Sequence, residues 1–206
     1  MTVSTQKTSA VANSAVRFSH DYLDIYAREE FRDLVLNANV HGLQALLGFV
    51  FHDERLLLEV TIHPSVLPDH DIRAGEGRLF LRTYGEEVIR AAVRNTMRFR
   101  TSFPVTVSRS CIAQMAESIG LDGFLLLGDL FEEVTKNSPV WENVLARALG
   151  ALVGAIYLDQ GWPAAFDFAF HLARYQLGES MSESVPSRAV VKRTINADFI
   201  DWDRLV

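Results

Sequence analysis

The segment from residue 138 to residue 161 constrains the fold of this chain most, because it carries the start, body and end of one long helix. Ser138 supplies a hydroxyl group that can cap a helix, and Pro139 follows at the first helical position. Mostly apolar residues continue to Leu158, and Gly161 follows as a terminator. We therefore expect a helix from residue 139 to about residue 158.

Helical patterns recur along the rest of the chain. Apolar residues spaced for one helix face, together with capping residues, predict six more helices. No segment shows the strict apolar–polar alternation that is typical of a strand. The prediction is an all-α fold with further helices over residues 21–37, 42–50, 54–62 (capped by Asp53), 78–100, 108–119 and 163–177, and a loop over 64–77.

Composition divides the chain into one helical domain, residues 21–178, and two tails. Residues 1–20 contain no acidic residue but four serines and three threonines. This bias fits either a mitochondrial or chloroplast targeting segment or a plain N-terminal tail. Residues 179–206 form a C-terminal tail too short to build a second core. No apolar run reaches the roughly 18 residues of a membrane span, so no membrane association is expected.

Charge is distributed unevenly. The net charge of −6 argues against a protein that coats itself in nucleic acid, but residues 78–109 carry seven arginines and two glutamates. This strip has a local charge of +5, and about −11 remains elsewhere. Arginines recur every four residues at Arg90, Arg94 and Arg98, with Arg100 just beyond. We interpret these four as a localised RNA contact; a solvated helix face is the alternative.

Other signatures of chemistry are weak. The single cysteine, Cys111, lies in an apolar helical pattern and is interpreted as a small hydrophobic residue. The loop from His63 to Asp71 matches no zinc spacing, and no glycine-rich phosphate loop occurs. We therefore predict no bound cofactor.

Two segments together resemble the ribonuclease III family. Residues 79–86 (Leu-Phe-Leu-Arg-Thr-Tyr-Gly-Glu) resemble its Leu-Glu-Phe-Leu-Gly-Asp element, and residues 144–159 resemble its later element ending Gly-Ala-Ile-Tyr-Leu-Asp. Residues 47–53, 61–65 and 107–128 add further similar pieces in the same order. The resemblance implies the helical endonuclease domain of that family, without a double-stranded-RNA-binding domain.

The resemblance also implies where a metal site would lie. Four carboxylates of the family hold a divalent metal, and the matching positions here are Arg82, Glu86, Arg147 and Gly150. One carboxylate remains of four, so the expectation is a degenerate site with no metal and no catalytic residue. Glu86 could bridge Arg82 and Arg147; alternatively, both arginines extend to solvent without a partner.

Degenerate members of the family occur in two settings that the resemblance brings in. One is the large subunit of the mitochondrial ribosome, which predicts a non-catalytic structural protein in contact with rRNA and other ribosomal proteins. The alternative is an inactive partner of an active endonuclease in a mitochondrial RNA-editing or RNA-processing complex. Either setting implies a mitochondrial location and pairing with another ribonuclease III-like protein. The expected interface of that heterodimer consists of Leu79, Phe80, Leu81 and Tyr84.

Overall fold

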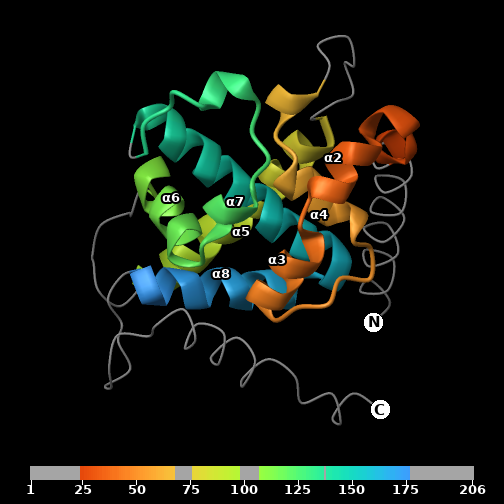
Figure 1. Ribbon diagram of the computed structural model, residues 1–206. Helices are drawn as coiled ribbons and strands as arrows, with labels where there is room; N and C mark the ends of the chain where they lie inside the picture. Colours follow the sequence, from red (N-terminus) through yellow and green to blue (C-terminus); the bar gives the residue numbers. More distant parts are fainter. Residues whose placement is uncertain (1–23, 68–75, 98–106, 137, 177–206) are drawn as a thin grey trace, which may run out of the picture.

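The computed structural model describes residues 24–67, 76–97, 107–136 and 138–176, and these residues form an all-α domain (Figure 1). The two predicted tails, residues 1–20 and 179–206, lie outside them. The described part contains no strand and no double-stranded-RNA-binding domain; a single parallel bridge joins Ile62 to Leu126. The α-helices are α2 (Arg32–Asn37), α3 (Val40–Leu47), α4 (Arg55–Thr61), α5 (Glu76–Met97), α6 (Arg109–Ser118), α7 (Pro139–Gln160) and α8 (Trp162–Gln176).

Helix α7 is the centre of the domain. The Ser138 hydroxyl accepts a hydrogen bond from the Trp141 amide at 3.2 Å, and Gly161 ends the helix with φ of 88°. Almost every residue from 144 to 156 is buried, because α4, α5, α6 and α8 all pack against this helix (Figure 1). The prediction of one long helix in this segment is confirmed.

Glycines allow α5 and α7 to cross with their backbones almost touching. A Cβ atom on Gly85 of α5 would lie 1.8 Å from the Gly150 carbonyl oxygen. A Cβ atom on Gly154 of α7 would lie 2.0 Å from the Leu81 carbonyl oxygen. No side chain fits at either position, and this close crossing brings the facing residues of the two helices together.

The N-terminal helix is the main error of the sequence-based prediction. Residues 24–37 form two short 3-10 turns, Asp24–Ala27 and Glu29–Phe31, followed by the six-residue α2. Tyr26 and Phe31 both pack into a small second core with residues of α4. Residues five apart on a regular helix diverge by about 140°, so a continuous helix could not bury both rings.

Several helix ends differ from the prediction by a turn or less. Helix α3 begins at Val40, two residues early, because the Asn39 side chain caps it by accepting from the Gly42 amide at 2.9 Å. It ends at Gly48 in the left-handed conformation, φ 73°. The Asp53 carboxylate accepts from the Arg55 amide at the start of α4, as expected of a cap.

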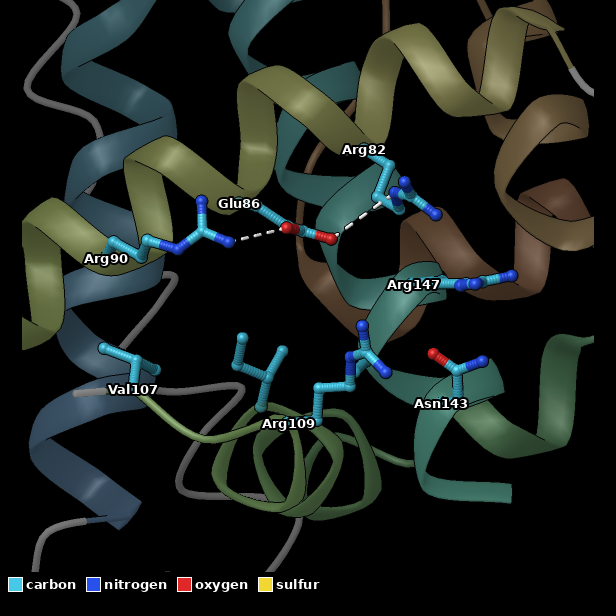
Figure 2. Close-up of a pocket in the computed structure, with 9 residues that line it drawn as sticks. Arg82, Glu86, Arg90, Val107, Arg109, Asn143 and Arg147 are labelled. Carbon is cyan, nitrogen blue, oxygen red and sulfur yellow. Dashed lines mark hydrogen bonds and ion pairs between the residues drawn. The ribbon is translucent and has the colours of Figure 1, made fainter. Parts of the chain in front are cut away.

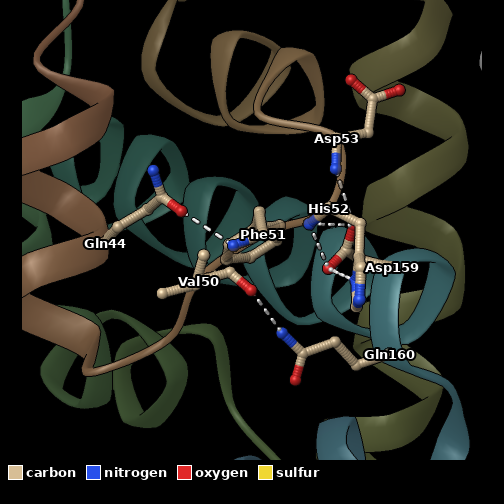
Figure 3. Close-up of polar contacts among 7 residues, drawn as sticks. All are labelled: Gln44, Val50, Phe51, His52, Asp53, Asp159 and Gln160. Atoms are coloured by element: carbon tan, nitrogen blue, oxygen red, sulfur yellow. Dashed lines mark hydrogen bonds and ion pairs between the residues drawn. The ribbon is translucent and has the colours of Figure 1, made fainter.

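The loop between α3 and α4 is tied to the end of α7 (Figure 3). The buried Asp159 carboxylate accepts from the backbone amides of His52 and Asp53, each at 3.0 Å. Gln160 donates to the Val50 carbonyl, and the Gln44 side chain accepts from the Phe51 amide. Asp159, the final residue of the second family-like segment, therefore has a structural role in this chain.

A buried polar cluster joins α4 to the start of α5. Arg78 is 5% exposed and donates to the carbonyls of Val60 at 2.9 Å and Ile62 at 3.1 Å. Glu59 is 2% exposed, and its carboxylate accepts from the Arg78 backbone amide. Arg78 was counted in the basic strip, but burial removes it from the surface and lowers its pKa to about 10.

Burial raises the pKa of Glu59 from 4.5 to about 7, which predicts a pH-dependent stability. Between these pH values the folded chain binds more protons than the unfolded chain, so the Glu59 contribution to stability falls as pH rises. We expect the unfolding free energy of the native chain, relative to Glu59→Gln, to fall between about pH 4.5 and pH 7 by up to about 1.4 kcal/mol per pH unit. Urea denaturation at several pH values measures this difference. Glu87→Gln, which changes an exposed glutamate, is the matched control. The prediction is contradicted if the unfolding free energy depends on pH in the same way in the Glu59→Gln and Glu87→Gln chains.

Candidate functional site

The four positions that the family resemblance matches to carboxylates meet where α5 crosses α7. Arg82 and Glu86 lie one turn apart on α5, and Arg147 and Gly150 lie three residues apart on α7. A Cβ atom on Gly150 would lie 3.0 Å from Arg82 Cγ and 3.2 Å from Glu86 Cγ. The structure thus brings together the four positions that the sequence singled out, and Gly150 leaves room for the stems of the two α5 side chains.

These residues line a pocket of about 150 Å³ (Figure 2). Its walls come from three helices and from the residue that leads into α6. Helix α5 contributes one wall, α7 another, and the beginning of α6 closes the third side. The lining residues are Arg82, Glu86, Arg90, Val107, Arg109, Ile112, Asn143, Ala146 and Arg147.

Glu86 bridges two arginines, but the second is not the one expected. Its carboxylate lies 3.4 Å from Arg82 Nε and accepts from Arg90 Nη2 at 2.8 Å (Figure 2). Within the described part of the chain, Arg147 makes no ion pair with it. Arg82 and Arg90 both lie four residues from Glu86 on the same helix, which is the favourable spacing for such pairs. The predicted bridge across the two helices is therefore wrong in its second partner.

The same contacts correct the proposed arginine stripe. Arg90 is half-buried and pairs with both Glu86 and Glu87, so it belongs to the pocket wall. Arg94 is exposed on α5, as an RNA contact requires. Arg98 and Arg100 lie outside the described residues.

Two polar residues of the pocket were missed by sequence reasoning. Asn143 lies four residues before Arg147 on α7, so its helical spacing could have placed it on the same face. Arg109 follows the Ser108 cap at the start of α6, and no local pattern links it to α5 or α7. Only the packing of α6 against α7 brings Arg109 to the pocket.

Positive charge dominates the pocket. Four arginines face one glutamate, and in the described residues neither Arg109 nor Arg147 has an ion-pair partner. Burial lowers the pKa of the Arg147 guanidinium, and repulsion from Arg82 and Arg109 lowers it further, while Glu86 opposes the shift. The fold therefore holds like charges together against their mutual repulsion.

The pocket residues do not fit a divalent metal. Mg²⁺ prefers several oxygen ligands, whereas this site offers one carboxylate that is already shared by two arginines. No group of three or more histidine, cysteine, aspartate or glutamate side chains is placed to hold a metal anywhere in the described ranges. What the arrangement suits chemically is an anion.

The expected interface residues lie on α5, and one of them is misplaced. Leu79 is 52% exposed, Tyr84 is 43% exposed and Phe80 is partly buried, so these three reach the surface. Leu81 is 0% exposed because its side of α5 packs on α7, and it belongs to the core. A partner can therefore contact the other three but not Leu81.

An aromatic row continues from this surface across α7 to α8. Tyr84 stacks on Tyr157 with ring centres 5.8 Å apart, and Tyr157 meets Trp162 edge-on at 6.4 Å. Trp162, 47% exposed, stacks in turn on Phe166, and that ring stacks on Phe170. The sequence-based prediction found only the α5 end of this row.

Among the helices described, none is both long enough and apolar enough to span a bilayer.

Comparison with known proteins places this domain. No protein-family model matches the chain. The Ribonuclease 3 of Carboxydothermus hydrogenoformans is 31% identical over 160 residues, which cover 72% of this chain and 66% of that protein. The Ribonuclease 3 of Variovorax paradoxus is 31% identical over 140 residues, 63% of this chain and 58% of that protein. The chain thus spans at most about two thirds of these relatives.

The structural comparison agrees on the fold. The nuclease domain of ribonuclease III from Campylobacter jejuni superimposes with a TM-score of 0.52 and 23% identity. The match covers 67% of this chain and 98% of that domain. Helix order, the α5–α7 crossing and the sequence relatives lead to one conclusion: this chain contains a ribonuclease III-like domain.

Proposed function

We propose that this chain is a non-catalytic ribonuclease III-like protein with a structural role in the large subunit of the mitochondrial ribosome. In that role it pairs with another ribonuclease III-like protein, contacts other ribosomal proteins and makes a localised contact with rRNA. The observation that carries the proposal is the charge of the pocket at the α5–α7 crossing, where four arginines surround one glutamate.

This charge opposes metal-dependent cleavage for a simple electrostatic reason. Arginine stays protonated at every pH relevant to a cell and offers no lone pair to a metal. Arg82 and Arg147 stand where the family resemblance places two carboxylates, and Gly150 supplies no ligand at a third position. A divalent cation would meet a cluster of positive charge, so the hydrolytic step lacks its activating ion.

The exposed aromatic row supports a role in protein contacts. Tyr84 and Trp162 are both more than 40% exposed and lie along one continuous set of stacked rings. Partly exposed aromatic side chains clustered in this way are typical of interface cores. The excess negative charge outside residues 78–109 would repel a second copy, which favours a different, more basic partner.

Exposed arginines near the pocket support one localised RNA contact. Arg94, Arg109 and Arg147 are exposed and come from three different helices. Arginine is well suited to phosphate oxygens because its planar guanidinium donates paired hydrogen bonds. The acidic balance of the remaining chain confines such a contact to this region.

Co-purification tests the assignment. We expect an affinity-tagged full chain, expressed in the organism that encodes it, to bring down large-subunit mitochondrial ribosomal proteins, their rRNA and one further ribonuclease III-like protein. Mass spectrometry and RNA sequencing of the purified material identify these components. Enrichment of an active endonuclease with RNA-editing or RNA-processing factors, without ribosomal proteins, would contradict the ribosomal role and support the alternative.

A cleavage assay on the same material tests the loss of catalysis. We expect double-stranded RNA to remain intact with Mg²⁺ or Mn²⁺. The Glu86→Gln variant is the control, since it removes the last carboxylate of the site. Cleavage by the native chain that disappears in this variant would show an active enzyme.

A further inference from the structure

The arginine pocket has more hydrogen-bond donors and more positive charge than its own residues use. Glu86 and Glu87 pair with Arg82 and Arg90, which leaves Arg109 and Arg147 as an excess charge of +2 beside a cavity of about 150 Å³. Arg109 extends from α6 toward the cavity, and Arg147 lines it from α7 (Figure 2). Burial, and after it repulsion from Arg82 and Arg109, lowers the pKa of Arg147, so a counter-charge inside the cavity would relieve an unfavourable arrangement.

Two buried polar atoms of residues that line this pocket have no hydrogen-bond partner. Arg82 Nε is buried and has no hydrogen-bond partner, because its contact with Glu86 is a 3.4 Å ion pair without hydrogen-bond geometry. The Asn143 side-chain oxygen is also buried without a partner. Rotation of that amide by half a turn presents its NH₂ group instead, which is a donor. A buried polar group without a partner is costly, and an acceptor in the cavity would satisfy both.

The number and direction of the donors distinguish between anions. Arginines of α5, α6 and α7 line the cavity on three sides, and together they offer more hydrogen-bond donors than the two oxygens of a carboxylate can accept. A phosphate monoester carries about −1.5 to −2 charges near pH 7 and three strong acceptor oxygens. An internal RNA phosphodiester carries a single charge and is joined to nucleotides on both sides. It therefore suits an open groove better than a small cavity.

We propose that the pocket at the α5–α7 crossing is an oxyanion site that binds a phosphate monoester, held by Arg82, Arg109 and Arg147, with Arg90 and Glu86 fixing its wall. Replacement of carboxylates by arginines has converted a cation site into an anion site. The ligand is either the terminal phosphate of an RNA or a free phosphate, since both present the same chemistry. This inference rests on the part of the proposed function that removes metal chemistry from the pocket, and it does not depend on the ribosomal assignment.

Calorimetry on the full 206-residue chain tests the proposal with inorganic phosphate at pH 7.5, against sodium chloride of equal ionic strength. We expect saturable binding of phosphate and a rise in melting temperature that chloride does not produce. Arg109→Ala and Arg147→Ala should each weaken phosphate binding about tenfold or more, the loss expected for a charge-assisted hydrogen bond. Arg32→Ala is the matched control, because Arg32 is exposed on α2 and does not line the pocket.

The melting temperature without phosphate separates a binding role from a structural one. Removing one of several repelling charges should leave the unliganded Arg109→Ala chain at least as stable as the native chain, while the phosphate-dependent increase disappears. Absence of saturable phosphate binding, or an equal loss in Arg32→Ala, would overturn the proposal. Either result would leave the co-purification outcome untouched, so failure of this site is distinguishable from failure of the proposed function.

Two short RNAs of the same sequence distinguish the source of the phosphate. If an RNA with a 5′-phosphate binds at least tenfold more tightly than one with a 5′-hydroxyl, and Arg109→Ala removes the difference, the ligand is an RNA end. Equal binding of the two RNAs together with phosphate binding that depends on Arg109 identifies free phosphate as the ligand.

Discussion

Gly154→Ala is expected to destabilise the chain by more than about 4 kcal/mol, an exceptional effect for one added methyl group. The new Cβ atom would lie 2.0 Å from the Leu81 carbonyl oxygen and 2.6 Å from its carbonyl carbon. These are backbone atoms of α5, so no side chain can rotate away and the two helices must separate. Because α7 is buried along most of its length, separation opens the main core.

Gly85→Ala should have a similar effect from the other helix, since its Cβ atom would lie 1.8 Å from the Gly150 carbonyl oxygen. Gly123→Ala is the control, because no atom lies within 4 Å of the added group; a surface change of this kind shifts stability by about 0.5 kcal/mol or less. Urea denaturation followed by circular dichroism measures all three variants. Near-native stability of Gly154→Ala would show that the helices do not cross as closely as described.

Arg78→Met is expected to destabilise the chain by about 3–5 kcal/mol, the range for breaking a buried charged pair by removal of one partner. The guanidinium satisfies the carbonyls of Val60 and Ile62 and compensates the buried Glu59 carboxylate. Methionine fills similar space but donates no hydrogen bond. For a chain of this size the loss corresponds to a fall in melting temperature of roughly 6–20 °C.

Arg94→Met on the exposed face of α5 is the matched control for Arg78→Met. A double variant with Glu59→Gln should be less unstable than the sum of the two single changes, because the neutral amide no longer needs a counter-charge. Thermal melts of the native chain, Arg78→Met, Glu59→Gln and the double variant give the coupling free energy between the two residues. Additive losses would mean that Arg78 and Glu59 act independently.

Features with local causes could be predicted from the sequence. Caps act within three residues, so Ser138 and Asp53 were assigned correctly from neighbouring residues alone. Helical spacing likewise placed Arg82 beside Glu86 without knowledge of the fold. Glu86 and Arg90 are also four residues apart, so the sequence could have predicted their ion pair as well, but this pair was overlooked.

Features that depend on packing between distant segments could not be predicted in this way. Leu81 looked like an interface residue, but the direction in which α5 meets α7 buries it completely. Arg78 looked like part of a basic surface, but its side chain turns inward to the carbonyls at the end of α4. The sequence pattern placed Tyr26 and Phe31 on one helix. In the structure both rings pack into the same small core, which a single helix would not allow.

The sequence by itself determined the all-α class, the long central helix and the presence of one carboxylate among the four positions that the family resemblance singles out, because residue identity and short-range spacing decide these properties. Only the tertiary structure decided that Arg147 stays apart from Glu86, that Arg109 joins the pocket, and that the aromatic row continues onto α8. The physical reason is the backbone contact at Gly85 and Gly154. It sets how closely α5 and α7 approach, and with that distance, which side chains from separate helices meet around one pocket.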